Sequence, residues 1–198
     1  MPRPPVIAHH LIWAAYGTWL PNDPRGSGSQ TVRAGWLADL GEVYHGRKRI
    51  QPQRTEVRQF YGEAEPRLQH DVLRFDRAQR DAIAAAFADL IARTPYTCYA
   101  CAIMPDHVHL VVRKHRHLAE EMIDNLQAAS RSRLSAERLV PPQHPVWTVG
   151  GWKKFLSTPQ RVRETIAYVE KNPLKEGLPA QHWPFVTTYD GWPYHRWR

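Results

Sequence analysis

Four stretches of the chain have the residue pattern of β-strands. Residues 6–20 are rich in aromatic and aliphatic side chains and end at a run of Pro, Asn, Asp, Gly and Ser, which favours a turn. Residues 96–104 and 107–113 are separated only by a Pro-Asp pair, so they predict a tight antiparallel hairpin. Residues 146–155 contain a Gly-Gly pair and predict a short strand, a turn and more strand.

Three other stretches repeat apolar side chains at helical spacing. Residues 76–93 begin with an Asp that can cap a helix and have a Gln three residues later. A second helix is expected from residue 118 until the Pro-Pro pair at 141 stops the pattern. A third begins at Thr158-Pro159 and is expected to end at Asn172-Pro173, because proline has no amide hydrogen. No internal repeat or linker is evident, so we predict one domain.

Two segments lie outside this pattern. Residues 22–75 are polar and poorly periodic, and we interpret them as an insertion with one or two short helices. Residues 179–198 form an aromatic and basic tail. Its aromatic side chains are candidates for stacking on unpaired bases, or else for core and dimer contacts; they are Trp183, Tyr189, Trp192, Tyr194 and Trp197.

The charge of the chain indicates a polyanionic partner. Its 198 residues include 27 Lys and Arg against 19 Asp and Glu, a net charge of +8, and nucleic acid is the usual partner of such a protein. The alternatives are a merely soluble basic protein and a membrane-surface binder, although the arginines are dispersed. No apolar run approaches the roughly 20 residues of a membrane span. The first five residues lack the features of a signal peptide, so no membrane partner and a cytoplasmic location are expected.

The two cysteines are expected to be structural. Cys98 and Cys101 are three residues apart in a predicted strand, which places them on opposite faces and unable to bridge readily. A lone C-x-x-C is otherwise a weak signal for metal or redox chemistry.

Two histidines stand two residues apart in the second strand of the predicted hairpin. Side chains at positions i and i+2 of a strand share a face, so His107 and His109 are expected to project side by side, opposite Val108, Leu110 and Val112. Two imidazoles held in parallel form a pair of metal ligands that lacks a third. Such pairs are also found as ordinary core or surface histidines.

The third predicted helix has two distinct faces at about 100° per residue. Val162, Ile166 and Val169 form the face that is expected to be buried. The neighbouring arc carries a cation, a hydroxyl, a phenol and an amide, from Arg161, Thr165, Tyr168 and Asn172. This face suits phosphoryl transfer, because a divalent metal on the phosphate oxygens polarises the target of a phenol nucleophile.

The combined pattern predicts a phosphodiester-cleaving metal site. His107, His109 and the amide oxygen of Asn172 are the expected ligands of Mg²⁺ or Mn²⁺, with Tyr168 one helical turn away. Arg161 is placed to neutralise a non-bridging phosphate oxygen. Further DNA contacts are predicted at Thr165, Lys175, Arg131 and Arg133. Taken singly, a Tyr on a helix flank is ordinary packing and an Asn before Pro is a common helix end.

Two of these segments resemble a known family. Met-Pro-Asp-His-Val-His-Leu at 104–110 resembles the HUH motif (His, hydrophobic, His) of single-tyrosine HUH transposases. Tyr-Val-Glu-Lys-Asn-Pro-Leu-Lys-Glu-Gly-Leu at 168–178 resembles their tyrosine helix, most closely that of the REP-associated tyrosine transposases. The order of strand, helix, hairpin, helix and tyrosine helix also agrees. The resemblance covers about residues 6–20 and 76–178.

The resemblance implies a ferredoxin-like, RRM-like α+β fold in which helices pack on an antiparallel sheet. It implies a metal-dependent endonuclease and strand transferase that cleaves single-stranded DNA near a hairpin through a 5′-phosphotyrosine, often as a homodimer. Tyr168 is then the nucleophile, His107 and His109 are metal ligands, and Asn172 matches the third ligand by its offset. The competing functions are a replication or relaxation nickase, a non-catalytic DNA-hairpin-binding protein, and a structural metal-binding protein without a DNA role.

Overall fold

One four-stranded antiparallel sheet, in the order β2-β3-β1-β4, forms the centre of the protein. The computed structural model describes residues 5–32 and 35–194, so Trp197 of the predicted tail and the N-terminal residues 1–4 lie outside the described part. The strands are β1 (Ala8–Ala14), β2 (Cys98–Ile103), β3 (His107–Arg113) and β4 (Trp152–Leu156). The predicted β2–β3 hairpin is confirmed.

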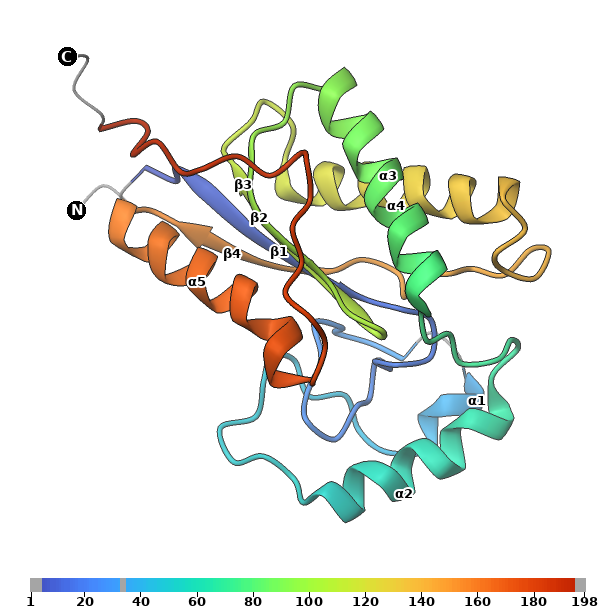
Figure 1. Ribbon diagram of the computed structural model, residues 1–198. Coiled ribbons are helices and arrows are strands. Elements are labelled where there is room, and N and C mark those ends of the chain that lie inside the picture. Colours follow the sequence, from blue (N-terminus) through green and yellow to red (C-terminus); the bar gives the residue numbers. More distant parts are fainter. Residues whose placement is uncertain (1–4, 33–34, 195–198) are drawn as a thin grey trace.

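Helices cover both faces of this sheet (Figure 1). α3 (Arg77–Arg93) and α4 (Ala119–Ala136) pack side by side on one face, and α5 (Pro159–Lys175) packs on the other. The element order β1-α3-β2-β3-α4-β4 gives an α+β fold with the ferredoxin-like arrangement, as predicted. The site predicted from the sequence therefore lies between the sheet and α5.

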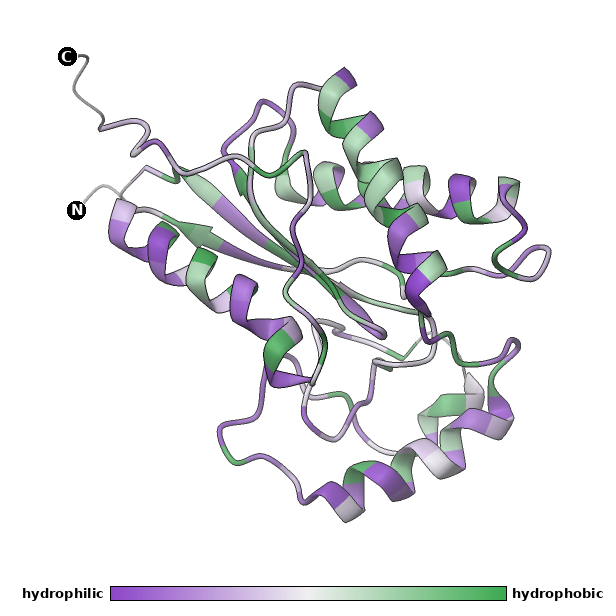
Figure 2. Cartoon of the chain, in the orientation of Figure 1, coloured by the Kyte–Doolittle hydropathy of each residue, from purple (hydrophilic) through white to green (hydrophobic). Residues whose placement is uncertain are grey.

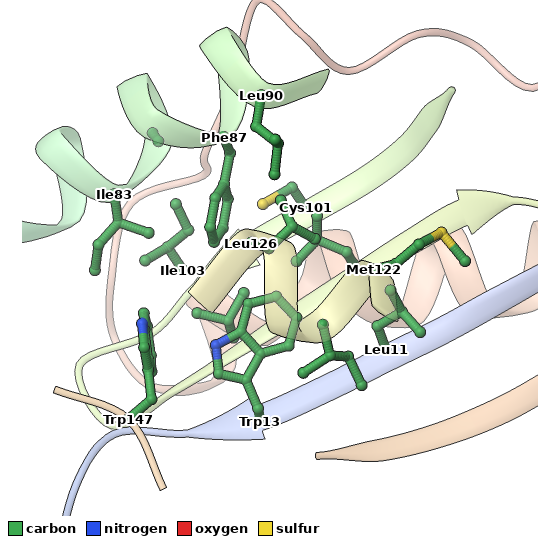
Figure 3. Packing of buried hydrophobic residues seen from close by; sticks show 14 of the residues in the cluster. Leu11, Trp13, Ile83, Phe87, Leu90, Cys101, Ile103, Met122, Leu126 and Trp147 are labelled. Carbon is green, nitrogen blue, oxygen red and sulfur yellow. The ribbon is translucent and has the colours of Figure 1, made fainter. Parts of the chain in front are cut away.

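The main core fills the space between the sheet and the α3–α4 layer. In Figure 3, Leu11 and Trp13 of β1 point toward Phe87 of α3 and toward Met122 and Leu126 of α4. All five side chains are at most 2% exposed. Figure 2 shows hydrophobic stretches along the strands and along α3, whereas α5 is largely hydrophilic. Burial on this scale, at roughly 25 cal/mol per Å² of apolar surface, is what holds the sheet in place beneath the site.

Two helices begin where the sequence predicts. Asp76 caps α3, because its Oδ1 accepts from the Gln79 amide at 2.8 Å while the Gln79 side chain accepts from the Asp76 amide at 2.9 Å. Thr158 caps α5 by accepting from the Arg161 amide at 3.3 Å, with proline at the first helical position. Each cap satisfies an amide that the helix itself leaves without a partner.

The end of α5 differs from the prediction. The helix does not stop at Asn172-Pro173 but continues to Lys175, with Pro173 inside its last turns. Gly177, two residues beyond this end, terminates the helix, because its φ of +72° allows the Leu178 amide to reach the Pro173 carbonyl at 2.8 Å and the Gly177 amide to reach the Leu174 carbonyl at 3.2 Å. This pair of bonds is a Schellman motif, which provides a better helix end than the proline does. Asn172 consequently stays in helical register with Tyr168.

Two predicted strands are shorter in the structure. β1 ends at Ala14 rather than Leu20, because Gly17 has a φ of +78° and the Thr18 hydroxyl donates to the carbonyls of Ala15 and Asp106 at 2.8 and 2.9 Å, which turns the chain. In the 146–155 stretch only β4 is a strand, and Trp147 forms an isolated bridge to Ala15.

The two cysteines share a face, contrary to the prediction. A β-bulge between Cys98 and Ala100 shifts the alternation of β2 by one residue, so Cys98 and Cys101 both lie in the core beneath α3 and α4. Both are free and buried, as expected of structural cysteines.

Residues 22–75 contain α1 (Gly35–Ala38), α2 (Arg54–Ala64) and the short 3₁₀ helix η1 (Glu65–Arg67), which matches the predicted short helices. They lie at one end of the sheet in Figure 1, where Leu37, Phe60 and Ala64 form a small separate core with Leu20. None of the described helices has both the length and the apolar character needed to cross a membrane.

The segment after α5 runs back along β2. The side chain of Gln181 donates to the Ile103 carbonyl and accepts from its amide, both at 2.8 Å, and the Thr187 amide donates to Cys98 at 2.8 Å. These bonds satisfy backbone groups on the outer edge of β2, which would otherwise be open to another chain. The tail residues Trp183 and Phe185 pack on the main core, and Tyr189 and Trp192 pack on the core beneath α5.

Candidate active site

The histidine pair and the helical tyrosine meet between β3 and α5. His107 and His109 lie on the α5 side of the sheet with ring centroids 4.8 Å apart, while Val108 and Leu110 enter the opposite core. The Tyr168 ring stands edge-on to His109 at a centroid distance of 5.8 Å. The structure therefore brings together two side chains of a strand and one of a helix about 60 residues later in the chain.

A third histidine completes the cluster. His10 of β1 lies diagonally across from His109, because β1 pairs with β3 in a register that sets Ile12 opposite His109. Its Nε2 is 3.0 Å from Nδ1 of His109, the two rings are stacked at 5.1 Å, and Tyr168 stands edge-on to it at 6.0 Å. His10 and His109 are both buried, so this hydrogen bond is shielded from water.

The Nδ1 atoms of both strand histidines are held by neighbours. Asp106 accepts from Nδ1 of His107 at 2.6 Å, and His10 holds Nδ1 of His109. Within residues 5–32 and 35–194, neither Nε2 atom has a hydrogen-bond partner. A histidine that binds metal through Nε2 needs this arrangement, in which its Nδ1–H donates to a nearby acceptor that fixes the tautomer and the ring orientation.

Asn172 lies one helical turn after Tyr168 on α5, the helix that packs on this face of the sheet. It is buried on α5, and its Nδ2 donates to the Tyr168 carbonyl at 3.3 Å, which leaves Oδ1 as its available ligand atom. In the described part of the chain no group of three His, Cys, Asp or Glu side chains is arranged to bind a metal ion. A metal on His107 and His109 would accordingly take its third protein ligand from an amide oxygen, and this N,N,O donor set fits a divalent cation with open positions.

The surroundings of His10 and His109 favour the neutral form of both imidazoles. Burial, followed by the charge of Lys154, lowers the pKa of His10 to about 4. Burial, followed by the charges of His107, His10 and Lys154, lowers the pKa of His109 well below its usual value. Burial alone would raise the pKa of Asp106, but the hydrogen bond and charge of His107 and the charge of Arg74 hold that pKa below its usual value. Neutral imidazoles beside an ionised carboxylate are the forms that bind a cation.

Tyr168 combines access with contact to the cluster. Its side chain is 45% exposed, although one edge faces the histidines. The Lys175 ammonium lies 4.8 Å from its ring centroid, on the solvent side of α5. Arg161 and Thr165 continue along the same helix, and the Thr165 hydroxyl donates to the Arg161 carbonyl at 2.7 Å. Arg161 and Lys175 are exposed, and each lies seven residues, about two helical turns, from Tyr168.

Two predicted DNA contacts lie elsewhere. Arg131 and Arg133 belong to α4, on the face of the sheet opposite Tyr168. Arg133 is paired with Asp89 at 3.0 Å and Glu137 at 2.8 Å, so its charge is already balanced. Arg131 is exposed. A DNA contact by either arginine stays a prediction, and it would be a contact outside this site.

Sequence reasoning missed His10. The alternation of the first strand places His10 and Ile12 on the face opposite Leu11 and Trp13, which marks His10 as a polar residue on one buried face. What the sequence could not supply is that β1 lies between β3 and β4 and in which register. His9, its neighbour, points to the other face and lies edge-on to Phe155 at 5.5 Å.

Comparison with known proteins finds similar solved structures, but it finds no matching family model and no matching curated protein. One similar solved structure is a REP-associated tyrosine transposase bound to a REP hairpin, with 9% identity and a TM-score of 0.46 over 90% of this chain and 74% of that one. Another is a protein of Deinococcus radiodurans R1 provisionally named a transposase, with 17% identity and a TM-score of 0.40 over 86% of this chain and 94% of that one.

Proposed function

We propose that this protein is a transposase-like, metal-dependent endonuclease and strand transferase that acts on single-stranded DNA near a hairpin. Tyr168 is the nucleophile, and His107, His109 and Asn172 hold Mg²⁺ or Mn²⁺. One observation carries this proposal. His107 and His109 are each held at Nδ1 by a neighbouring side chain, and the half-exposed ring of Tyr168 lies 5.8 Å from His109 between ring centroids. A structural metal site does not require a nucleophilic side chain with open access, whereas phosphodiester cleavage through a covalent protein–DNA intermediate does.

Each of these residues has a separate role in the cleavage step. The phenol of Tyr168 gives up its proton as its oxygen attacks phosphorus, and the bond from phosphorus to the 3′ oxygen breaks. The DNA 5′ end stays on the protein as a phosphotyrosine. The 3′ oxygen of the leaving strand takes up one proton, which balances the one that the phenol lost. A divalent cation, when bound, would neutralise the phosphate oxygens and polarise phosphorus. Asp106 and His10 keep the two ligand imidazoles in their Nε2-binding tautomers. Attack by a 3′-hydroxyl on the phosphotyrosine reverses the step and joins strands.

The electrostatics favour a DNA backbone at this place. The chain carries a net charge of +8. The charge of Lys154 acts on His109, the Lys175 ammonium lies 4.8 Å from the Tyr168 ring centroid, and Arg161 is exposed on the same helix. Phosphate contacts of this kind give affinity that falls steeply with salt. A homodimeric state and a cytoplasmic location belong to the same proposal, and light scattering of the purified protein tests the first of them.

Covalent capture of DNA tests the function. The protein is incubated with labelled hairpin-bearing single strands and Mg²⁺ or Mn²⁺, and the adduct is resolved on a denaturing gel. Wild type is expected to form an adduct that Tyr168→Phe and EDTA abolish. Tyr44→Phe is the matched control, because Tyr44 is 46% exposed and has Lys48 at 5.7 Å from its ring but lies in the insertion. Binding without any adduct would favour the hairpin-binding alternative, and an adduct that survives Tyr168→Phe would exclude the assigned nucleophile.

A further inference from the structure

Strand β4 presents one cation and one aromatic side chain to the site and one of each to the opposite face. It pairs with β1 so that Lys154 is opposite His10 and Trp152 is opposite Ile12. Because alternate residues share a face, Trp152 and Lys154 lie on the side of His10 and α5. Lys153 and Phe155 point the other way, where Lys153 forms an ion pair with Glu120 of α4 and Phe155 meets the edge of His9.

The two lysines differ in how their charges are used. Lys153 is balanced by Glu120, whereas Lys154 is exposed and has no acidic partner within ion-pair distance in the part of the chain that the structure describes. Residues directly opposite each other in an antiparallel pair have Cβ atoms about 5 Å apart, so Lys154 stands next to the imidazole of His10. The effect of its charge on both His10 and His109 is consistent with this position. An exposed ammonium without an acidic partner is available to bind an anion that approaches the proposed metal site.

Trp152 offers a flat surface on the same side. Its side chain is 38% exposed on the edge strand of the sheet, and the described residues place no further strand beside β4. The indole is supported from the insertion, since a Cβ at Gly28 would come within 3.3 Å of its Cε3 atom and the His45 ring lies 6.4 Å away. A supported, half-open indole is suited to stacking on an unpaired base, and any base has a π face for it.

We propose that β4 is the track of the DNA single strand at the cleavage site, with Lys154 bound to a backbone phosphate next to the attacked one and Trp152 stacked on a base. This inference rests on the proposed function, because it assumes that the anion which approaches His10 is DNA. A single strand fits the pair better than a duplex does, since only an unpaired base exposes the face that Trp152 would cover. In this proposal residues 22–75 support the Trp152 ring through Gly28 and His45.

Equilibrium binding to a hairpin-bearing single strand tests the inference, in a Tyr168→Phe background so that no cleavage occurs. Lys154→Gln is expected to weaken binding and to reduce the slope of log affinity against log salt by about 0.7, the value for one phosphate contact on a single strand. Trp152→Ala is expected to weaken binding by about 5- to 150-fold without change of slope, which corresponds to about 1–3 kcal/mol for one stacked base.

Conservative variants and the opposite face of β4 provide the controls. Lys154→Arg and Trp152→Phe should restore most of the affinity, which a folding defect would not allow. Lys153→Gln and Phe155→Ala change the same residue types on the same strand and should bind like the parent. If Lys154→Gln and Trp152→Ala match these controls while wild type still forms the tyrosine adduct, the track on β4 is wrong and the proposed function stands. If wild type forms no adduct and binds no single strand, both are wrong. Equal binding of a duplex of the same sequence would overturn the assignment of a single strand.

Discussion

His10→Phe should weaken metal binding although residue 10 is not itself a proposed ligand. The substitution keeps an aromatic ring of similar size in a buried position but removes Nε2, the atom that lies 3.0 Å from Nδ1 of His109. Without that acceptor, the His109 tautomer with its proton on Nδ1 has a buried donor that lacks a partner. The proton is then better placed on Nε2, the atom that the metal requires.

The size of the effect follows from the hydrogen bond. Leaving a buried donor without a partner costs about 1–3 kcal/mol. Loss of a residue that orients a ligand histidine typically lowers metal affinity by about 10- to 100-fold, which is about 1.4–2.7 kcal/mol. The two ranges agree, so we expect the dissociation constant for Mn²⁺ to rise by about 10- to 100-fold in His10→Phe.

Isothermal titration of Mn²⁺ into the full chain measures this constant directly. His9→Phe is the matched control, because His9 is also buried but points to the other face and its Nδ1 has no partner among the described residues. This control should bind Mn²⁺ like wild type. Unchanged affinity in a folded His10→Phe protein, or an equal loss in both variants, would refute the assigned role of His10.

Changes elsewhere in the site and its scaffold have separate expected effects. Asp106→Asn should lower Mn²⁺ affinity by about 10- to 100-fold in the same titration, because the carboxylate that holds Nδ1 of His107 at 2.6 Å is lost. Denaturant titration in EDTA should show the unfolding free energy of wild type falling by up to about 3 kcal/mol as pH decreases from 6.5 to 4. The reason is that folded His10 has a pKa of about 4, so the unfolded state takes up the proton first. The unfolding free energy of His10→Phe should fall less, and an equal fall would contradict this. Gly177→Ala should lower the unfolding free energy by about 1 kcal/mol, because the φ of Gly177 is +72° although a Cβ there would meet no other atom. The control Gly62→Ala, inside α2, should raise the unfolding free energy. An unchanged unfolding free energy in Gly177→Ala would argue against the Schellman motif.

Local sequence signals predicted most of the elements correctly. The alternation of β3, the Asp76 capping box and the Thr158-Pro159 helix start each depend on residues within one or two turns of one another. For the same reason, the faces of β3 and α5 could be assigned before their contact was known. The contact of Tyr168 with His109 follows once the two faces are packed together.

What the sequence could not predict depends on long-range pairing or on competition between local signals. His10 joined the site only because β1 lies beside β3 in a particular register, and neighbouring strands are not encoded in either strand alone. At the end of α5, Gly177 prevailed over Pro173, since the Schellman bonds satisfy the last carbonyls while proline removes only one bond. The bulge in β2 reversed the face of one cysteine, and a single extra residue has no pattern of its own.

Mass spectrometry of the trapped DNA adduct tests the central claim most directly. After reaction with a short single strand and Mn²⁺, trypsin cleavage at Arg163 and Lys171 releases residues 164–171, in which Tyr168 is the only tyrosine. The account predicts that this peptide carries a nucleotide joined through its 5′ phosphate to Tyr168. A nucleotide found on another tyrosine, such as Tyr44, would contradict it, as would a reaction that cuts the strand without leaving DNA on the protein.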